Sequence, residues 1–332
     1  MVLVFGVGSI EDFHYYYIAL VAAGIVTAFE LMMVWLKETP RWLLSKGYKL
    51  QTIATLKFLR GPKIGFEREL KDMEVVLTEN INLSMLQVLK EFKRRSVLIP
   101  FLIVVVIMFF QVIGGISALS PYAASIFKEA GVPHPKLASI YSIGSAGLLV
   151  IVAVLLVDIA GRKVLLVVSG LGTALSCVML GTHFFLTRPS LCHSNVNLSV
   201  ALLQSTTTTD APCNPQYAPL AIVSVFLFCA LFSVGWGPIP WVLLGELLPL
   251  QVRGVASGMV AIVNSGTAAM ATGFYPKYSQ AVTPWFAWWS FAIINLTSVV
   301  FVVLCVFETK GKALEEIQSR YEGKKNLYVC RD

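Results

Sequence analysis

The chain has 332 residues, of which 56% are hydrophobic and 14% are charged, and its mean hydropathy is +0.74. Because soluble domains carry about 25% charged residues, this composition excludes an ordinary soluble protein and indicates a polytopic membrane protein. The formal net charge of +7 would also fit a nucleic-acid-binding protein, but the uneven distribution of the basic residues among the loops excludes that class.

The N-terminal part of the chain contains one short and one complete apolar segment. Residues 1–10 form an apolar run of about half the ~20 residues that a spanning helix needs. This run has neither the basic start nor the cleavage site of a signal peptide. Residues 16–36 are long and apolar enough to cross a bilayer, and we predict that they form the first complete span.

Residues 37–95 form a long polar stretch. Its charged residues, which include a basic cluster from Lys90 to Arg95, recur in a helical pattern, so we interpret it as a solvated helical segment. Six further apolar stretches follow and bring the predicted number of spans to seven. They are residues 97–119, 137–157, 164–186, 219–244, 254–275 and 285–307.

Lysine and arginine residues are concentrated in alternate loops. The segments 37–95, 158–163 and 245–253, together with the residues after 307, hold 22 of the 26 basic residues, whereas the opposite loops hold four. By the positive-inside rule, we expect residues 37–95 and the C-terminus to lie in the cytoplasm. Seven spans would then place the N-terminus on the opposite side of the membrane.

Residues 187–218 form a long loop on the predicted non-cytoplasmic side and are rich in Ser, Thr, Asn and Pro. Asn197, in an Asn-Leu-Ser sequon, is a glycosylation acceptor on the correct side of the membrane, although a sequon can remain unused. Cys192 and Cys213 flank the sequon in a compartment that permits disulfides. The sequence does not determine whether these two cysteines pair.

The most unusual stretch is GWGPIP at residues 235–240, which lies inside a long apolar run. Its glycines, Gly235 and Gly237, and its prolines, Pro238 and Pro240, deny a helix several of its backbone hydrogen bonds. Broken backbone at membrane depth is tolerated only where protein or a water-filled cavity satisfies the freed groups. Because transporters place substrate at such breaks, the stretch predicts a polar cavity, and the alternative is a proline kink that only shapes packing.

Together with Trp241, Glu246 and Arg253, this stretch resembles the tenth membrane helix and following loop of the sugar porter family. These are the facilitative glucose transporters of the major facilitator superfamily. Four further motifs occur in the family's order: Glu38-Thr39-Pro40-Arg41-Trp42-Leu43, Gln111 with Gly115-Ile116, Asp158 with Gly161-Arg162-Lys163, and Glu308-Thr309-Lys310-Gly311. The sequence is most similar to the intracellular branch of the family, which carries a long glycosylated loop between its ninth and tenth helices.

The resemblance implies an all-α membrane protein with the major facilitator fold, of which this chain is similar to the C-terminal six-helix half plus the sixth helix. Residues 1–36 would hold a remnant of the fifth helix and the complete sixth helix, and residues 37–95 the cytoplasmic helical linker. Residues 96–307 would form the C-terminal six-helix transmembrane domain, and residues 308–332 a cytoplasmic tail. Because the N-terminal half is missing from this sequence, we interpret it as a fragment, a short isoform or an incomplete gene model.

The resemblance also implies a sugar site that contains Gln111, Trp241 and Asn264, with Ser117 and Tyr122 as further candidates. The two amides can donate and accept hydrogen bonds, as a polyol requires, and Trp241 offers a flat ring with an N–H at its edge. The alternative for each amide is a hydrogen bond between helices, and for the tryptophan it is packing.

The chain departs from the family's pattern at several positions of this site. Val112 replaces a second glutamine and Ser117 replaces an asparagine, while Ala146 and Ser265 stand where an asparagine and a tryptophan are usual. Each lost hydrogen bond to a buried hydroxyl costs about 0.5–1.5 kcal/mol. We therefore expect a weaker hexose site than one built from many amides.

A second set of residues lies at the predicted cytoplasmic ends of the helices. By resemblance, it forms the salt-bridge network that ties the two halves together in the outward-facing state and breaks when the cavity opens inward. The alternative is interfacial charge that only fixes topology. The residues are Glu38, Arg41, Asp158, Arg162, Glu246, Arg253 and Glu308.

The sequence contains no arrangement typical of an enzyme. None of its four histidines lies at metal-ligand spacing with cysteines or carboxylates, and no phosphate-binding loop or nucleophile elbow is present. We therefore expect no catalytic residues, no metal and no cofactor.

From the resemblance we expect transport of a hexose or a related sugar or polyol by alternating access, as a facilitative uniporter or coupled to protons. The alternative is a non-transporting isoform or a regulatory partner of full-length sugar porters. The expected partners are the sugar and the lipid bilayer but no nucleic acid, with a second chain as one source of the missing half. The expected location is the plasma membrane or an endosomal or lysosomal membrane, as a multi-pass protein.

Overall fold

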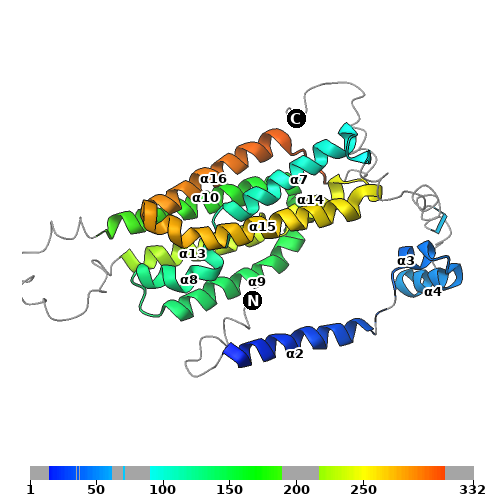
Figure 1. Cartoon of the computed structure of the whole chain (residues 1–332), viewed down its shortest axis with the longest axis horizontal. Coiled ribbons are helices and arrows are strands. Elements are labelled where there is room, and N and C mark those ends of the chain that lie inside the picture. Colours follow the sequence, from blue (N-terminus) through cyan, green and yellow to red (C-terminus); the bar gives the residue numbers. More distant parts are fainter. Residues whose placement is uncertain are drawn as a thin grey trace, which may run out of the picture. The chain divides into compact units, whose positions relative to one another are not determined.

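A computed structural model of the chain describes residues 15–34, 36, 38–61, 70–71, 90–188 and 217–310 (Figure 1). In these residues the regular secondary structure is helical, which confirms the predicted all-α class. The chain divides into two compact units, of which one ends at Phe92 and the other begins at Lys93.

The first unit contains α2 (Tyr15–Val34), α3 (Pro40–Ser45) and α4 (Lys49–Arg60). With 20 residues, α2 is about 30 Å long, which matches the hydrocarbon thickness that the first predicted span must cross. Thr39 caps α3, since its side-chain oxygen accepts a hydrogen bond from the backbone N–H of Trp42 at 3.4 Å. The helices α3 and α4 confirm helical structure in the described part of the polar stretch 37–95.

The second unit contains eight helices within its described residues. They are α7 (Arg95–Ile113), α8 (Ile116–Glu129), α9 (Pro135–Ala160), α10 (Arg162–Leu186), α13 (Ala218–Val234), α14 (Ile239–Leu247), α15 (Leu250–Val282) and α16 (Pro284–Cys305). Because α7 continues into α8 and α13 into α14, they make six segments long and apolar enough to cross a membrane. The six predicted spans after residue 95 are thereby confirmed. The remaining predicted span, residues 16–36, corresponds to α2.

Two of the spans predicted from the sequence are shorter than the helices in the structure. The span predicted to end at residue 119 breaks at Gly115, where φ is +110°, and then continues as α8 to Glu129. The prediction stopped near Pro121, which lacks the N–H that would bond the carbonyl of Ser117. The helix continues because the hydroxyl of Thr272, on α15, donates to that carbonyl at 3.2 Å.

The span predicted to end at residue 275 also continues further in the structure. Pro276 lies inside α15, which runs on to Val282, and it leaves the carbonyl of Thr272 without its helical donor. The Tyr122 hydroxyl, on α8, donates to this carbonyl at 3.3 Å. A proline therefore does not end a membrane helix when a neighbouring helix supplies the missing donor.

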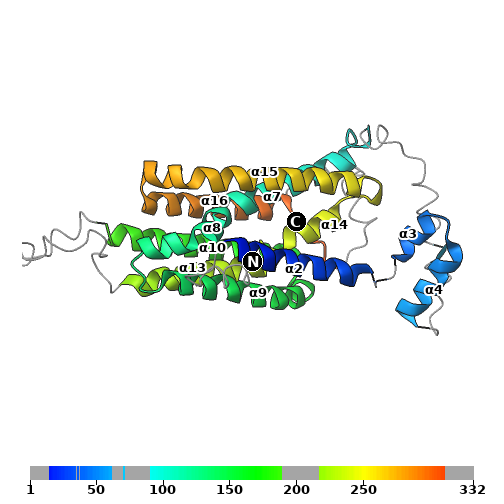
Figure 2. The ribbon, with the colours of Figure 1, turned by 60° about the horizontal axis from the view of Figure 1, so that its bottom comes forward.

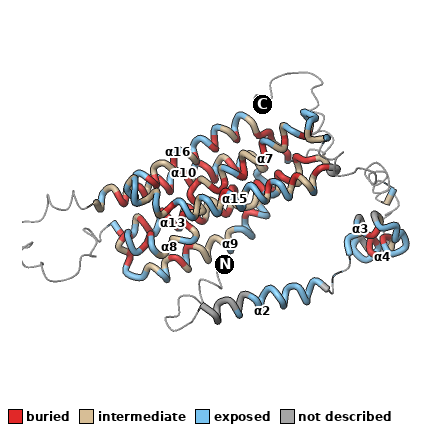
Figure 3. The backbone as a smooth tube through the Cα atoms, viewed as in Figure 1, coloured by how far each residue is buried: buried red, intermediate tan, exposed pale blue. Residues whose placement is uncertain are grey.

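Within the second unit, α10 packs against both α13 and α16, and α15 packs against α7. Figure 2 shows α15, α16 and α7 on one side of this unit and α13 and α9 on the other. Figure 3 colours the backbone red at buried residues, and the largest fully buried side chains include Trp288 on α16 and Phe127 on α8.

The outer face of α9 is apolar and exposed. Leu148, Ile151, Leu155 and Ile159, which recur every three or four residues, are 65% to 71% exposed. Such a stripe would be a liability in water, whereas it matches the hydrocarbon of a bilayer. The exposure pattern is therefore that of a membrane-spanning helix.

Candidate functional site

The predicted helix break lies between α13 and α14, at residues 235–238. Because Pro240 has no N–H, the carbonyl of Trp236 lacks the donor that a continuous helix would supply. Gln111, on α7, fills this place: its Nε2 donates to the Trp236 carbonyl at 2.7 Å and to the Gly237 carbonyl at 3.0 Å. Neighbouring protein therefore satisfies the broken backbone at these two carbonyls.

The break is also fixed to α10. The indole of Trp236 is buried, and its Nε1 donates to the carbonyl of Leu166 at 3.1 Å, while its backbone N–H donates to Ser169 Oγ at 3.2 Å. Gly235 packs so closely on Ser169 that a Cβ at this position would collide with it. The glycine is therefore required by close approach of the two helices.

The structure brings together Gln111 and Asn264, two of the predicted sugar-binding residues. Asn264, on α15, donates from Nδ2 to Gln111 Oε1 at 3.1 Å. A glutamine has two donor hydrogens and two acceptor lone pairs, so Gln111 is left with one lone pair for a ligand. Its amide thus acts chiefly as an interhelical hydrogen-bonding group, which was the alternative interpretation of the sequence.

Trp241 has a different environment from Trp236. It lies in the first turn of α14, and 46% of its side chain is exposed in this unit. Its ring is therefore accessible from outside the six-span unit, as a stacking surface for a ligand must be. Asn264 is half-buried, with its Nδ2 directed to Gln111.

Tyr122 and Ser117, the other two sugar-site candidates, take part in the contact between α8 and α15. The Tyr122 hydroxyl donates to the carbonyl of Thr272, and the Thr272 hydroxyl donates to the carbonyl of Ser117. Each bond replaces one that a proline removes, Pro276 in the first case and Pro121 in the second. These bonds give Tyr122 a structural role that the sequence did not reveal.

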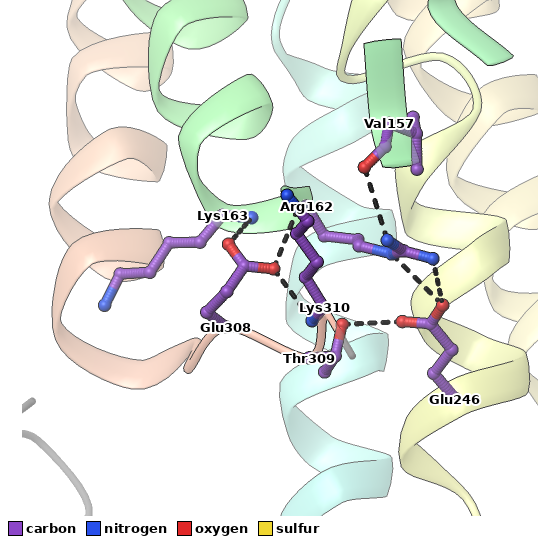
Figure 4. A network of polar contacts seen from close by, with 7 residues as sticks. All are labelled: Val157, Arg162, Lys163, Glu246, Glu308, Thr309 and Lys310. Atoms are coloured by element: carbon purple, nitrogen blue, oxygen red, sulfur yellow. Dashed lines mark hydrogen bonds and ion pairs between the residues drawn. The ribbon is translucent and has the colours of Figure 1, made fainter. Parts of the chain in front are cut away.

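A charged cluster joins the α9–α10 turn, α14 and the segment after α16 (Figure 4). Arg162 donates to Glu246 Oε1 from Nε at 3.2 Å and from Nη2 at 3.0 Å, and from Nη1 to the carbonyl of Val157 at 3.3 Å. The other carboxylate oxygen of Glu246 accepts a hydrogen bond from the Thr309 hydroxyl at 2.6 Å. The Arg162 and Glu246 side chains are 14% and 26% exposed, so water screens this ion pair only partly.

Glu308 occupies the N-terminus of α10. Its carboxylate accepts hydrogen bonds from the backbone N–H groups of Arg162 at 2.9 Å and Lys163 at 3.1 Å. A carboxylate at this place satisfies donors that the first helical turn leaves free and interacts favourably with the helix dipole. Gly161 has a φ of +90°, and a Cβ there would lie 2.7 Å from Glu308 Oε2.

The other predicted charged residues of the cytoplasmic set are Glu38, Arg41, Asp158 and Arg253. Arg253 donates from Nε and Nη2 to the carbonyl of Leu248, at 3.3 and 2.9 Å. Glu38 belongs to the other unit. The side chains of Arg41 and Asp158, and all of Cys192, Asn197 and Cys213, lie outside the described residues, so their roles stay predictions.

Sequence reasoning missed two polar residues that the structure places at important contacts. Thr309 is 4% exposed and lies in the Glu308-Thr309-Lys310-Gly311 motif, of which only Glu308 is among the predicted site residues. Asn295, on α16, donates from Nδ2 to the carbonyl of Gly114 at 2.7 Å, at the α7–α8 break. Its signal in the sequence was an amide inside an apolar span, which is a functional or structural candidate by default.

No group of three or more His, Cys, Asp and Glu residues in the described part of the chain could hold a metal ion.

The model of the family described as "Sugar (and other) transporter" matches residues 2–321. The chain belongs to this family. It is accordingly a multi-pass membrane protein, in agreement with its six long apolar segments.

Two relatives illustrate the similarity. The facilitated glucose transporter member 8 of solute carrier family 2 from Bos taurus is 35% identical over 299 residues, which are 89% of this chain and 59% of the relative. The facilitated trehalose transporter Tret1 from Bombyx mori is 32% identical over 322 residues, which are 96% of this chain and 59% of the relative. The chain thus spans about three-fifths of the length of these curated relatives.

Solved structures confirm the fold. The proton:xylose symporter XylE bound to 6-bromo-6-deoxy-D-glucose superposes with a TM-score of 0.67 at 24% identity, over 92% of this chain and 59% of that one. The inward-open xylose transporter XylE from E. coli gives a TM-score of 0.65 at 22% identity, over 96% and 62%. The predicted major facilitator fold is therefore confirmed.

Proposed function

We propose that the protein takes part in alternating-access transport of a hexose or a related sugar, which binds beside the α13–α14 break. One observation carries this proposal. In a chain of the sugar transporter family, the backbone carbonyls at the break, the Gln111 side chain that donates to them, and Asn264 form one hydrogen-bonded group. The named activities of the relatives, glucose and trehalose transport, support a sugar as the substrate.

Three residues have different roles in the proposed binding of the sugar. Trp241 stacks on the apolar C–H face of the sugar, since its ring is accessible. Asn264 supplies the carbonyl oxygen of its amide as an acceptor for a sugar hydroxyl. Gln111 positions the break and offers the sugar at most one acceptor lone pair.

The Arg162, Glu246, Glu308 and Thr309 contacts all lie within the second unit. These contacts would therefore hold α10, α14 and the segment after α16 together while the unit moves as a rigid body. The resemblance implies contacts between the two halves for all seven of the charged residues. We propose that the contacts which break and re-form are made by Glu38, Arg41, Asp158 and Arg253.

The topology follows from the charge bias of the loops. We place the charged cluster and the C-terminus in the cytoplasm and Asn197, as a glycosylation acceptor, on the opposite side. The predicted divisions at residues 36, 95 and 307 stay part of this proposal. A binding site at the membrane midplane, between two halves of a transporter, requires walls from both halves. If this sequence is the whole polypeptide that it represents, a second chain would have to supply the other half.

Uptake of radiolabelled glucose and trehalose into liposomes that contain the purified 332-residue chain tests the function. We expect saturable uptake of one of these sugars that falls in Trp241→Ala. Failure of both sugars to enter, with protein that is folded by circular dichroism, would contradict transport by this chain and favour a regulatory role.

A further inference from the structure

A cavity of about 440 Å³ lies between the α7–α8 junction, α15 and α16. Its walls are largely apolar and aromatic, and they include Val112, Gly115, Phe274, Phe291 and Ile294. Ser117, a predicted sugar-site residue, also lines it, whereas Gln111, Trp241 and Asn264 do not. A cavity of this size can enclose a small molecule, and its lining sets the chemistry of that molecule.

The cavity opens to the outer surface of the six-span unit. Two of its lining residues, Phe274 on α15 and Ile293 on α16, are 62% and 65% exposed. Both helices are long and apolar enough to span a membrane, so an opening on their surface that no other protein covers would meet acyl chains in a bilayer. A ligand would therefore enter sideways from the lipid.

Two of the hydroxyl-bearing residues that line the cavity, Tyr278 and Ser290, lie near one end of α15 and α16. Tyr278 is four residues, about 6 Å, before the end of α15 at Val282, and Ser290 is six residues, about 9 Å, after the start of α16 at Pro284. Ala271 lies about 10 Å deeper along α15 than Tyr278. The cavity thus has the hydroxyl groups of Tyr278 and Ser290 toward this end of the two helices, and it extends about 10 Å from Tyr278 along α15.

The two hydroxyl groups at this end can only accept a further hydrogen bond. The Tyr278 hydroxyl donates to Ser290 Oγ at 2.9 Å, and the Ser290 hydroxyl donates to the carbonyl of Ala287 at 2.7 Å. Each hydroxyl has one hydrogen and two lone pairs, so both hydrogens are already in use. A ligand that binds here must bring its own donor.

We propose that this cavity binds a membrane sterol, whose hydroxyl donates to Tyr278 Oη and whose rigid apolar body packs against Phe274 and Phe291. A sugar does not fit this chemistry, because its many hydroxyls would meet a mostly apolar wall and lose hydrogen bonds to water. A phospholipid acyl chain does not fit it either, because the ester oxygens at its head accept hydrogen bonds but do not donate them.

Photolabelling of the purified chain in phosphatidylcholine nanodiscs with a photoreactive cholesterol analogue tests the proposal. We expect the label on residues of α15 and α16 that line the cavity, and we expect excess cholesterol to displace it. Cholestane, which lacks the hydroxyl, should compete about two- to tenfold less well, which is the effect of one neutral hydrogen bond.

Two variants and a matched control locate the site. Ala271→Phe fills the cavity and should abolish competable labelling, whereas Ala269→Phe, on an exposed position of the same helix outside the cavity, should leave it unchanged. Tyr278→Phe keeps the ring but removes the acceptor, and should weaken labelling about two- to tenfold. Circular dichroism and elution as a single species establish that each variant is folded.

Three results would overturn the proposal. The first is labelling that maps outside α15 and α16 or that persists in folded Ala271→Phe. The second is equal competition by cholestane and cholesterol. The third is labelling of the same residues by a photoreactive phosphatidylcholine that excess cholesterol does not displace. If Ala271→Phe does not fold, Tyr278→Phe and the cholestane competition decide the matter.

Discussion

The Gln111 side chain donates a 2.7 Å hydrogen bond to the carbonyl of Trp236, 125 residues away in the chain. Pro240 makes that bond necessary, since it removes the helical donor. We predict that Gln111→Leu leaves a buried carbonyl unpaired and lowers the free energy of unfolding by about 1–3 kcal/mol. Thermal unfolding in detergent measures this.

Thr182→Val is the matched control for Gln111→Leu. The Thr182 hydroxyl is exposed and bonds only within its own helix, to the carbonyl of Val178 at 2.8 Å. Its removal should change stability by less than about 0.5 kcal/mol. Equal destabilisation by the two variants would contradict the assigned role of Gln111.

Tyr122 should matter for stability only while Pro276 is present. We predict that Tyr122→Phe destabilises the wild-type protein by about 1–3 kcal/mol, because the carbonyl of Thr272 loses its donor. In a Pro276→Ala background, residue 276 has an N–H for that carbonyl, so the same change should cost much less. A double-mutant cycle by thermal unfolding measures the difference, and additive effects would contradict the account.

Hydropathy and the glycine and proline positions were sufficient to predict six spans and the α13–α14 break. The partners of the freed carbonyls were not predictable in the same way. Gln111 bonds Trp236, and Tyr122 bonds Thr272, across sequence separations of 125 and 150 residues. Such pairs depend on how the helices are aligned beside one another, which a single sequence does not contain.

The same limit explains the errors at span ends. The predicted spans end at residues 119 and 275, just before Pro121 and Pro276, whereas hydrogen bonds between helices allow both helices to continue past these prolines. It also explains why the sequence did not reveal the role of Asn295. Its contact with Gly114 follows from the packing of α16 against α7.

The Thr309 hydroxyl should stabilise the charged cluster. Thr309→Val removes a 2.6 Å hydrogen bond to the Glu246 carboxylate and should cost about 1.5–3 kcal/mol, the range for bonds to charged groups. Thr309→Ser keeps the hydroxyl and should retain most of the stability. Chemical or thermal unfolding of the two variants distinguishes the hydrogen bond from packing, and equal loss in both would argue for packing.

Gly161 is expected to tolerate no side chain. Gly161→Ala must adopt a φ of +90° and place its Cβ 2.7 Å from Glu308 Oε2, so it should displace the carboxylate that caps α10. We expect a clear fall in the melting temperature. Gly245→Ala is the control, because it lies inside α14 with open space around its Cβ position and should preserve or raise stability.

Equilibrium binding of a radiolabelled hexose to the purified chain is the most direct test of the proposed sugar site. We predict saturable binding that Trp241→Ala weakens about tenfold through the loss of ring stacking. Phe286→Ala, which removes an aromatic ring with the same 46% exposure on α16, should bind as tightly as the wild type. No saturable binding by folded protein, or equal affinity in Trp241→Ala and the wild type, would contradict the central claim.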